Sequence, residues 1–279
     1  MAHPPEHPGV VLITGCSSGI GAACAEAFLA ARWTTIATAR RLESLDSLAR
    51  RGAVVAELDV TSDVQRREVV AELLARHGRI DVLVNNAGYP EYGPLEEVDL
   101  DRWRTQFETN VFSVVALSQL VIPAMRERGH GRIINLSSMG GVITLPLGSA
   151  YHASKWAVEA ISDVARFELA PFGIKVVVIQ PGVVLSNFET TAQHGLVVGP
   201  NSPYANLAAR FASLVRNSYA KKSSSNLSPQ AVAEVIVRAA TVPRPRTRYT
   251  LPLAAKLFVT VRPILPDRLY DLLQRSQIR

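Results

Sequence analysis

Short apolar runs alternate with longer amphipathic runs over the first 180 residues of the chain. The apolar runs lack polar alternation, as strands do when a parallel sheet buries both of their faces. These predicted strands span residues 10–14, 34–39, 53–60, 80–86, 131–138 and 174–181. The amphipathic runs predict helices at 19–32, 42–51, 62–77, 100–128 and 151–172. The alternation implies right-handed crossovers, so we expect an α/β fold with a doubly wound parallel sheet of about seven strands.

The pattern breaks after Pro181. Residues 183–227 mix glycine, asparagine, serine and apolar residues without a clear period, which predicts a substrate lid inserted into the domain. A helix follows at 228–241, with Ser228 as its cap and Pro229 at its first position, and 247–252 reads as one more strand. We therefore expect a single domain over 1–250 and an amphipathic C-terminal extension over 251–279.

The positive charge is concentrated at the C-terminal end. Eight basic and two acidic side chains lie between Arg244 and Arg279, a surplus equal to the +6 of the whole chain. The remainder is close to neutral, which argues against a nucleic-acid-binding protein. The basic tail could contact an anionic membrane surface or a partner, although a solvated terminal segment is the favoured interpretation.

Cysteine usage and the N-terminus predict a cytoplasmic protein. Cys16 and Cys24 are the two cysteines, and a helix between them would hold them too far apart for a disulfide. Free thiols suit a reducing compartment. No basic region followed by an apolar run opens the chain, and the uninterrupted apolar stretches are shorter than the roughly 20 residues of a spanning helix.

The segment TGCSSGIG, residues 14–21, lies between the first predicted strand and the first predicted helix. Gly15 permits the turn, while Gly19 and Gly21 would let the backbone approach a pyrophosphate at the helix N-terminus. A tight connection that needs glycine for other reasons is the alternative. Between a buried strand and a helix, the segment favours a Rossmann-like dinucleotide site.

A second candidate site is the pair Tyr151 and Lys155, four residues apart at a predicted helix start. Side chains at this spacing share one helix face. A lysine cation beside a phenol stabilises phenolate and would lower its pKa from about 10, which suits proton exchange with an alcohol or a ketone. Taken alone, the spacing is more typical of a surface Tyr–Lys contact, and the motifs elsewhere in the chain are what favour a catalytic pair.

Further motifs occur in order along the chain: LDVT with Asp59, NNAG at 85–88, TNVFS with Asn110, SS with Ser138, YHASK, and PGVVLS at 181–186. Together with the glycine-rich turn they resemble the short-chain dehydrogenase/reductase family over roughly residues 10–190. YHASKWAVE and the extended C-terminus are similar to the family branch that handles steroids and retinoids.

The resemblance implies a role for each matched position. Tyr151 would be the acid/base, Lys155 would hold the nicotinamide ribose, Ser138 would orient the substrate oxygen, and Asn110 would anchor a water that links Lys155 to solvent. The implied cofactor-binding residues, which include the catalytic Tyr151 and Lys155, are Gly15, Ser17, Ser18, Gly19, Ile20, Gly21, Arg40, Asp59, Val60, Asn86, Ala87, Gly88, Pro181, Gly182, Val184 and Ser186. No metal site is expected.

Several of these positions have alternative interpretations. Ser137 competes with Ser138, which is preferred by its spacing of thirteen residues before Tyr151. Asn110 could face water in mid-helix, although its apolar neighbours argue that it points inward, where its amide must be satisfied. Asp59 could cap the helix that begins near Ser62, whereas the resemblance places it near the adenine.

The end of the second predicted strand indicates the cofactor. An acidic residue there would bind the ribose hydroxyls of NAD, and an arginine suits the 2′-phosphate of NADP. The position falls on Ala39, followed by Arg40 and Arg41. No carboxylate competes, and a guanidinium suits bidentate phosphate contact, so NADP(H) is expected over NAD(H).

The predicted lid and the loop before Tyr151 supply apolar residues: Leu185, Phe188, Leu196, Val197, Val198, Tyr204, Leu207, Phe211, Met139 and the stretch 142–147. They favour an apolar alcohol or carbonyl substrate, or they simply pack the lid onto the core. The leading hypothesis is an NADP(H)-dependent oxidoreductase. The alternatives are an acyl-chain ketoreductase and a non-catalytic dinucleotide-binding sensor or scaffold. The resemblance implies a homodimer or homotetramer built on the two long helices.

Overall fold

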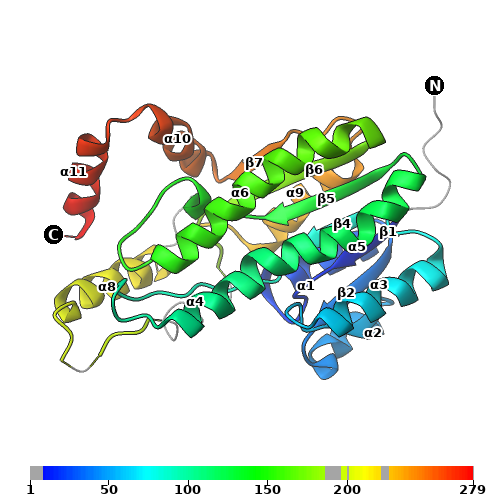
Figure 1. Ribbon diagram of the computed structural model, residues 1–279, viewed down its shortest axis with the longest axis horizontal. Coiled ribbons are helices and arrows are strands. Elements are labelled where there is room, and N and C mark those ends of the chain that lie inside the picture. Colours follow the sequence, from blue (N-terminus) through cyan, green and yellow to red (C-terminus); the bar gives the residue numbers. More distant parts are fainter. Residues whose placement is uncertain (1–8, 186–195, 200, 221–225, 279) are drawn as a thin grey trace.

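The computed structural model describes residues 9–185, 196–199, 201–220 and 226–278. Seven parallel strands form one sheet in the order β3-β2-β1-β4-β5-β6-β7 (Figure 1). This is the expected Rossmann-like doubly wound sheet, and it is confirmed. The strands are β1 (Val10–Ile13), β2 (Thr34–Ala39), β3 (Val54–Glu57), β4 (Val82–Asn85), β5 (Gly131–Leu136), β6 (Ile174–Pro181) and β7 (Arg248–Leu251).

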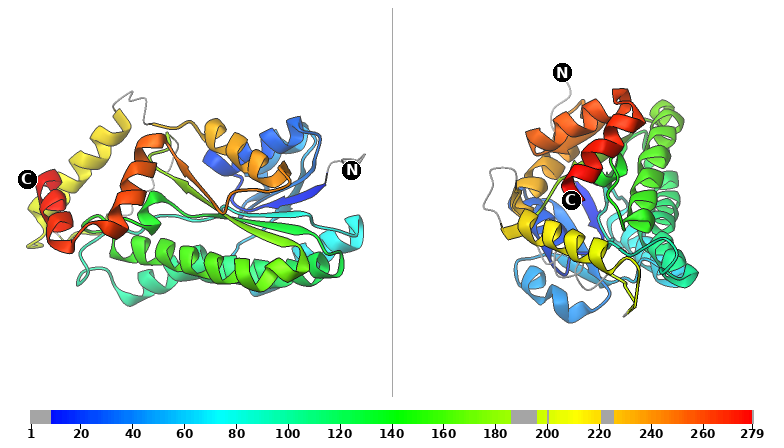
Figure 2. Two further views of the ribbon diagram at one scale, coloured as in Figure 1. Left: turned by 90° about the horizontal axis from the view of Figure 1, so that it is seen from above. Right: turned by 90° about the vertical axis from the view of Figure 1, so that its left-hand side faces the viewer.

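Helices cover both faces of the sheet (Figure 2, left). Successive strand residues point to opposite faces, so Val11 and Ile13 of β1 join one apolar core and Leu12 joins the other. On the first face lie α1 (Gly19–Ala30), α2 (Asp46–Arg50) and α9 (Pro229–Thr241). On the second lie α3 (Asp63–His77), α5 (Ser113–Glu127) and α6 (Ser149–Leu169), with α4 (Leu100–Phe107) leading into α5.

The predicted helix at 100–128 is interrupted by one wide turn. A π-helical segment, Glu108–Phe112, joins α4 to α5. By length and composition alone the run Leu100–Glu127 could cross a membrane, which the lengths of its uninterrupted apolar stretches did not reveal. Leu117, Val121 and Met125 instead pack in the second core against the sheet, as in a core helix.

Three helices lie beyond the carboxyl ends of the strands (Figures 1 and 2). α8 (Ala205–Ala220) falls within the lid that the sequence left without a period, while α10 (Leu253–Val261) and α11 (Asp267–Ile278) form the C-terminal extension. Ser228 caps α9 as expected, its hydroxyl accepting the Ala231 N–H. These outer helices stand where open α/β sheets bind ligands.

Candidate active site

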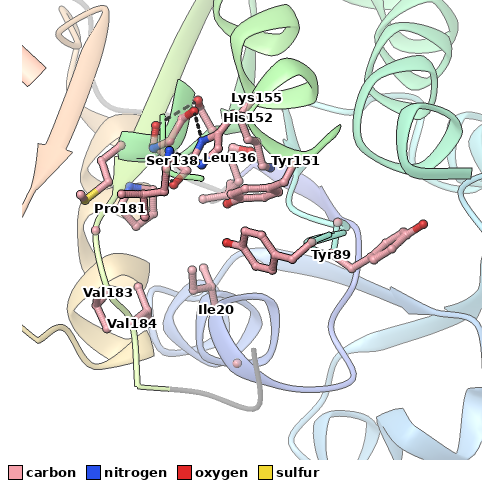
Figure 3. Close-up of a pocket in the computed structure, with 18 of the residues that line it drawn as sticks. Ile20, Tyr89, Leu136, Ser138, Tyr151, His152, Lys155, Pro181, Val183 and Val184 are labelled. Atoms are coloured by element: carbon pink, nitrogen blue, oxygen red, sulfur yellow. Dashed lines mark hydrogen bonds between the residues drawn. The ribbon is translucent and has the colours of Figure 1, made fainter. Parts of the chain in front are cut away.

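A cavity of about 1210 Å³ opens at the carboxyl ends of the strands. The glycine-rich turn, the ends of β2, β4, β5 and β6, the start of α6, and helices α8, α10 and α11 all contribute to its wall. Figure 3 shows Ser138, Tyr151 and His152 along one side of this space, and Ile20, Val183 and Val184 across from them. One chamber therefore joins the predicted dinucleotide site to the predicted catalytic residues.

The glycine-rich turn is held against β4 by polar side chains. Asn86 donates from Nδ2 to the carbonyls of Thr14 and Gly15, at 2.8 and 3.1 Å. The Thr14 hydroxyl accepts from the N–H groups of Asn86 and Ala87, both at 3.0 Å. Thr14, which the sequence reasoning did not single out, thus fixes two strand ends to each other.

The turn needs glycine for space and for conformation. Gly15 has φ 73°, and a Cβ there would lie 2.9 Å from the backbone of Ala87. A Cβ on Gly21 would lie 2.2 Å from the carbonyl oxygen of Gly15. Gly21 is not among the residues that line the cavity, so its absent side chain lets α1 pack beneath the turn rather than giving access to a ligand.

The N-terminus of α1 faces the cavity and suits a pyrophosphate. Ser18 is the N-cap, but its side chain makes no capping hydrogen bond. The backbone N–H groups of the first turn are therefore available to an anion, which the helix dipole also favours. Ser17, Ser18, Gly19 and Ile20 line the cavity at this point, so the residues present fit the diphosphate of a dinucleotide.

Arg40 and Asp59 line the end of the cavity beyond this turn. Burial alone would raise the pKa of Asp59, but hydrogen bonds from the Thr61 N–H and hydroxyl, with the charges of Arg40 and Arg66, lower it below its ordinary value. Asp59 does not accept a bond from the start of α3, which Ser62 caps through Gln65 N. The alternative reading of Asp59 as a helix cap is thus wrong.

Tyr151 and Ser138 meet through their hydroxyl groups, which share a hydrogen bond. The Tyr151 ring packs in an apolar cluster with Tyr92, at 5.8 Å between ring centroids. Burial raises the pKa of Tyr151 to about 12, and the Ser138 hydrogen bond offsets this only partly. The expectation that Lys155 lowers this pKa does not hold in the protein alone, because desolvation is the larger effect.

Lys155 is directed at the end of β5. Its ammonium donates to the carbonyl of Leu136 at 2.8 Å and lies 6.0 Å from the centroid of the Tyr151 ring. Burial lowers the Lys155 pKa to about 8, while the Glu159 carboxylate one helical turn later acts to raise it. The two side chains do share a helix face, and both are more than nine-tenths buried, which excludes a surface pair.

Asn110 lies in the π-helical turn and is buried. Its Nδ2 donates to the Tyr89 carbonyl at 3.0 Å and to the Ser154 hydroxyl at 3.1 Å, while its Oδ1 accepts the Tyr89 N–H at 3.1 Å. The amide points inward, as its apolar neighbours predicted. It does not line the cavity but joins the loop after β4 to α6, the helix that carries Tyr151 and Lys155.

His152 is a site residue that sequence reasoning missed. Its Nδ1 lies 2.9 Å from the Gly140 carbonyl, and its Nε2 accepts the Leu145 N–H at 3.0 Å. These partners require the neutral ring with its proton on Nδ1. Gly140 also donates its N–H to the Ser138 hydroxyl at 3.0 Å. His152 is therefore linked to Ser138 through a single residue.

The C-terminal extension is docked over the cavity, while the basic side chains of Lys256, Arg268 and Arg275 on it are exposed, as the interpretation of a solvated basic tail expected. The Tyr270 hydroxyl donates to the Thr144 carbonyl at 2.7 Å and accepts the Thr144 N–H at 2.9 Å. Gln274 also donates to the Thr144 carbonyl. The extension adds a set of lining residues that the sequence did not indicate: Leu257, Phe258, Val261, Arg262, Leu265, Tyr270, Leu273 and Gln274.

Most of the residues predicted for the site line this one cavity. Among the predicted catalytic and cofactor-binding residues, the exceptions are Gly21 and Asn110, which lie behind its wall, and Ser186, which falls outside the described residues. Among the lid residues predicted for the substrate pocket, Phe188 also falls outside the described residues, and six others do not line the cavity: Leu185, Leu196, Val197, Val198, Tyr204 and Leu207. The predicted site residues that do line it are Gly15, Ser17, Ser18, Gly19, Ile20, Arg40, Asp59, Val60, Asn86, Ala87, Gly88, Ser138, Tyr151, Lys155, Pro181, Gly182 and Val184.

Comparison with known proteins gives consistent matches. The family model described as short chain dehydrogenase matches residues 9–196. A 3-ketodihydrosphingosine reductase from Bacteroides thetaiotaomicron is 33% identical over 94% of this chain and 95% of its own length. A short-chain dehydrogenase from Streptomyces avermitilis is 36% identical, with a TM-score of 0.82 over 98% of this chain and 97% of that one. A serine dehydrogenase complexed with NADP+ is 29% identical, with a TM-score of 0.76 over 88% and 95%.

The glycine-rich turn, the buried Tyr151 and Lys155 pair and these matches agree on one assignment. The chain is an oxidoreductase that acts on CH–OH groups with a nicotinamide dinucleotide, and it belongs to the short-chain dehydrogenase/reductase family.

Proposed function

We propose that the protein is an NADP(H)-dependent oxidoreductase that interconverts an apolar secondary alcohol and its ketone or aldehyde, with Tyr151 as the acid/base. The observation that carries this proposal is the hydrogen bond between the Tyr151 and Ser138 hydroxyls in a cavity that the glycine-rich turn shares. A substrate oxygen that meets both hydroxyls would be oriented by Ser138 and exchange its proton with Tyr151.

The bound cofactor would supply or accept the hydride. In reduction, Tyr151 gives its proton to the carbonyl oxygen as negative charge develops there. The high pKa of Tyr151 keeps it protonated for this step, and Lys155 stabilises the phenolate that remains. In oxidation the same hydroxyl, once deprotonated, takes the proton of the alcohol.

The preference for NADP(H) rests on Arg40. It lines the cavity beside the end of β2, where Ala39 offers no carboxylate to a ribose, and a guanidinium can bind a phosphate in a bidentate manner. The serine dehydrogenase with NADP+ supports the choice. Steady-state kinetics with both cofactors test it: a higher kcat/KM with NAD(H) would refute the role of Arg40.

An apolar substrate is supported by the walls around Tyr151. Tyr92, Leu145, Phe211 and Val215 line this part of the cavity and pack around the tyrosine ring. The likeness to a 3-ketodihydrosphingosine reductase supports a ketone substrate, and the sequence resemblance to the steroid and retinoid branch supports an apolar one. An acyl-chain ketoreductase is the runner-up. A sensor without turnover would have no use for Tyr151, Lys155, Ser138 and Asn110 in one place.

The decisive experiment follows NADPH oxidation with a panel of hydrophobic ketones. We expect Tyr151→Phe to lower kcat/KM by at least a hundredfold, since general acid catalysis contributes about 10²–10⁴, while NADPH binding persists. Tyr249→Phe is the matched control, because it removes a hydroxyl outside the cavity. Full activity in Tyr151→Phe would remove this residue from the mechanism.

The assembly and location are part of the same proposal. Exposed apolar side chains lie along α5 and α6 and at their ends, including Phe112, Trp156, Val164, Phe167 and Phe172. A second copy of the chain would cover them, which favours a homodimer or homotetramer built on these helices. Two buried free thiols, Cys16 and Cys24, are compatible with a cytoplasmic location.

A further inference from the structure

Charge is distributed unevenly along the cavity. Arg40 and Asp59 line the end beyond the glycine-rich turn, and Lys155 lies beside Tyr151. Among the described lining residues, the only other charged side chain is Arg262, which follows α10 on the C-terminal extension. The same extension supplies apolar wall residues, among them Leu257, Val261 and Leu265. Apart from Lys155 beside Tyr151, the charge on the described residues of the substrate part of the cavity is thus the cation of Arg262 on its C-terminal wall.

The guanidinium of Arg262 is fixed but incompletely used. It stacks on the Tyr270 ring, with Cζ 4.1 Å from the centroid, and only a quarter of the side chain is exposed. It donates to the Leu265 carbonyl at 3.3 Å and to Asp267 at 3.0 Å. Of its five N–H donors, two have partners among the described residues. The Asp267 carboxylate is 86% exposed, so water screens this ion pair and a ligand could replace it.

A second polar group on the same wall lacks a partner. Gln274 lines the cavity, and its Nε2 donates to Thr144 and to Tyr270. Its Oε1 is buried and accepts no hydrogen bond from the described part of the chain. A buried acceptor without a donor is costly, so the position calls for a bound molecule or an ordered water. Tyr270 contacts both Arg262 and Gln274, which places the two polar groups around one ring.

We propose that Arg262 binds a carboxylate at the end of the substrate remote from the reacting carbon. The substrate class is an oxo or hydroxy acid with an apolar chain, whose oxygen meets Tyr151 and whose carboxylate meets Arg262. Water that hydrates the carboxylate supplies the O–H donor for Gln274 Oε1. This inference rests on the proposed function, since it deepens the substrate class of the same cavity.

The test compares a series of oxo fatty acids with their methyl esters, which differ in charge but hardly in shape. We expect the wild-type enzyme to have the higher kcat/KM on an acid. In Arg262→Gln, KM for the acid should rise about tenfold, because one charge-assisted hydrogen bond is lost. KM for the ester should stay unchanged. Arg268→Gln is the control, because it removes the same charge from an exposed position on α11. A wild type that does not discriminate, or an equal loss on acid and ester in Arg262→Gln, overturns the proposal.

A binding measurement separates this inference from the proposed function. The thermal shift produced by a saturated fatty acid, which cannot react, should exceed that of its methyl ester and should shrink in Arg262→Gln. If this pattern appears but no ketone is reduced, the proposed function fails and the carboxylate site stands. If ketones are reduced without any acid-specific shift, the carboxylate site fails alone.

Discussion

The hydrogen bonds of His152 predict a positioning role, exerted on Ser138 through Gly140. The His152 ring bonds the Gly140 carbonyl through Nδ1 and accepts the Leu145 N–H at Nε2. Gly140 in turn donates its N–H to the Ser138 hydroxyl. Loss of the ring should therefore misplace Ser138, and an error of about 1 Å is enough to be costly.

Three substitutions of His152 separate its two bonds. An asparagine amide can take the place of Nδ1 and a glutamine amide that of Nε2, whereas leucine replaces neither. We expect kcat to fall in the order His152→Asn, His152→Gln, His152→Leu, with about tenfold or more lost in the last, and with little change in NADPH affinity. An equal loss in all three, accompanied by equal losses in Tm, would indicate a purely structural role.

Lys155 gives the reaction a pH dependence. Its pKa of about 8 means that it loses its charge as the pH rises through that value, while Tyr151, with a pKa of about 12, keeps its proton. The kcat/KM for ketone reduction should therefore be constant below this pH and fall above it. Lys155→Arg, which stays charged, should remove the falling limb whatever its absolute rate. A wild-type profile that stays flat above a pH of about 8 would contradict this assignment.

At the level of the elements, Asp81 joins the starts of β1 and β4 to the C-terminal end of α5. Its carboxylate accepts the Val10 N–H of β1 at 2.8 Å and bonds Arg79 and Arg128 at 2.6 Å. Burial would raise its pKa, but the bonds from Arg79, Val10 and Arg128 hold it below its ordinary value. The native state is thus stabilised above the unfolded pKa, and this contribution is lost as the pH falls through the lower folded one.

Asp81→Ala should lower the free energy of unfolding by about 3 kcal/mol at neutral pH, because it removes a buried carboxylate and leaves the buried Val10 N–H and two partly exposed guanidinium groups without this partner. Asp101→Ala breaks an exposed pair with Arg104 and should cost less than about 1 kcal/mol. Urea unfolding at neutral and acidic pH measures both, and the difference between the variants should shrink in acid. Equal costs would show that Asp81 is not buried in a stabilising network.

The sequence predicted those elements whose pattern is set by the sheet. Runs such as 10–14 and 174–181 are apolar because both faces are buried, so their strands could be located without coordinates. α8 was not predicted, because its buried residues Ala208 and Phe211 pack against Tyr92 and Leu147. These partners are distant in sequence, so their contacts leave no helical period in the segment. The docking of Tyr270 on Thr144 was not predicted either, because these two residues are 126 positions apart.

Within the candidate site, too, the sequence predicted what depends on local spacing and missed what depends on distant contacts. Tyr151, Lys155 and the glycine-rich turn could be recognised from their spacing. The hydrogen bonds of His152 span 12 and 7 residues and leave no periodic trace in the chain. The raised pKa of Tyr151 also depends on burial by distant residues, which is why spacing alone gave the wrong direction.

For the whole molecule, the apolar face of α6 predicts the assembly. Phe167 is 71% exposed there, and Phe167→Glu would place a charge in the proposed interface. We expect this variant to be a monomer by light scattering, while the wild type is a dimer or larger. Leu95→Glu changes an equally exposed leucine outside α5 and α6 and should leave the assembly unchanged. A monomeric wild type would refute the interface.

The π-helical turn Glu108–Phe112 makes the number of residues between α4 and α5 important for the site. A π turn holds one residue more than an α turn, so deletion of one residue could restore a regular helix with better backbone bonding. The deletion would leave α4 and α5 in nearly the same rotational register, because the wide turn accommodates the extra residue. It would, however, remove the local widening in which Asn110 bonds both Tyr89 and Ser154. Deleting one residue at this point would thus give a more regular helix and a less active enzyme.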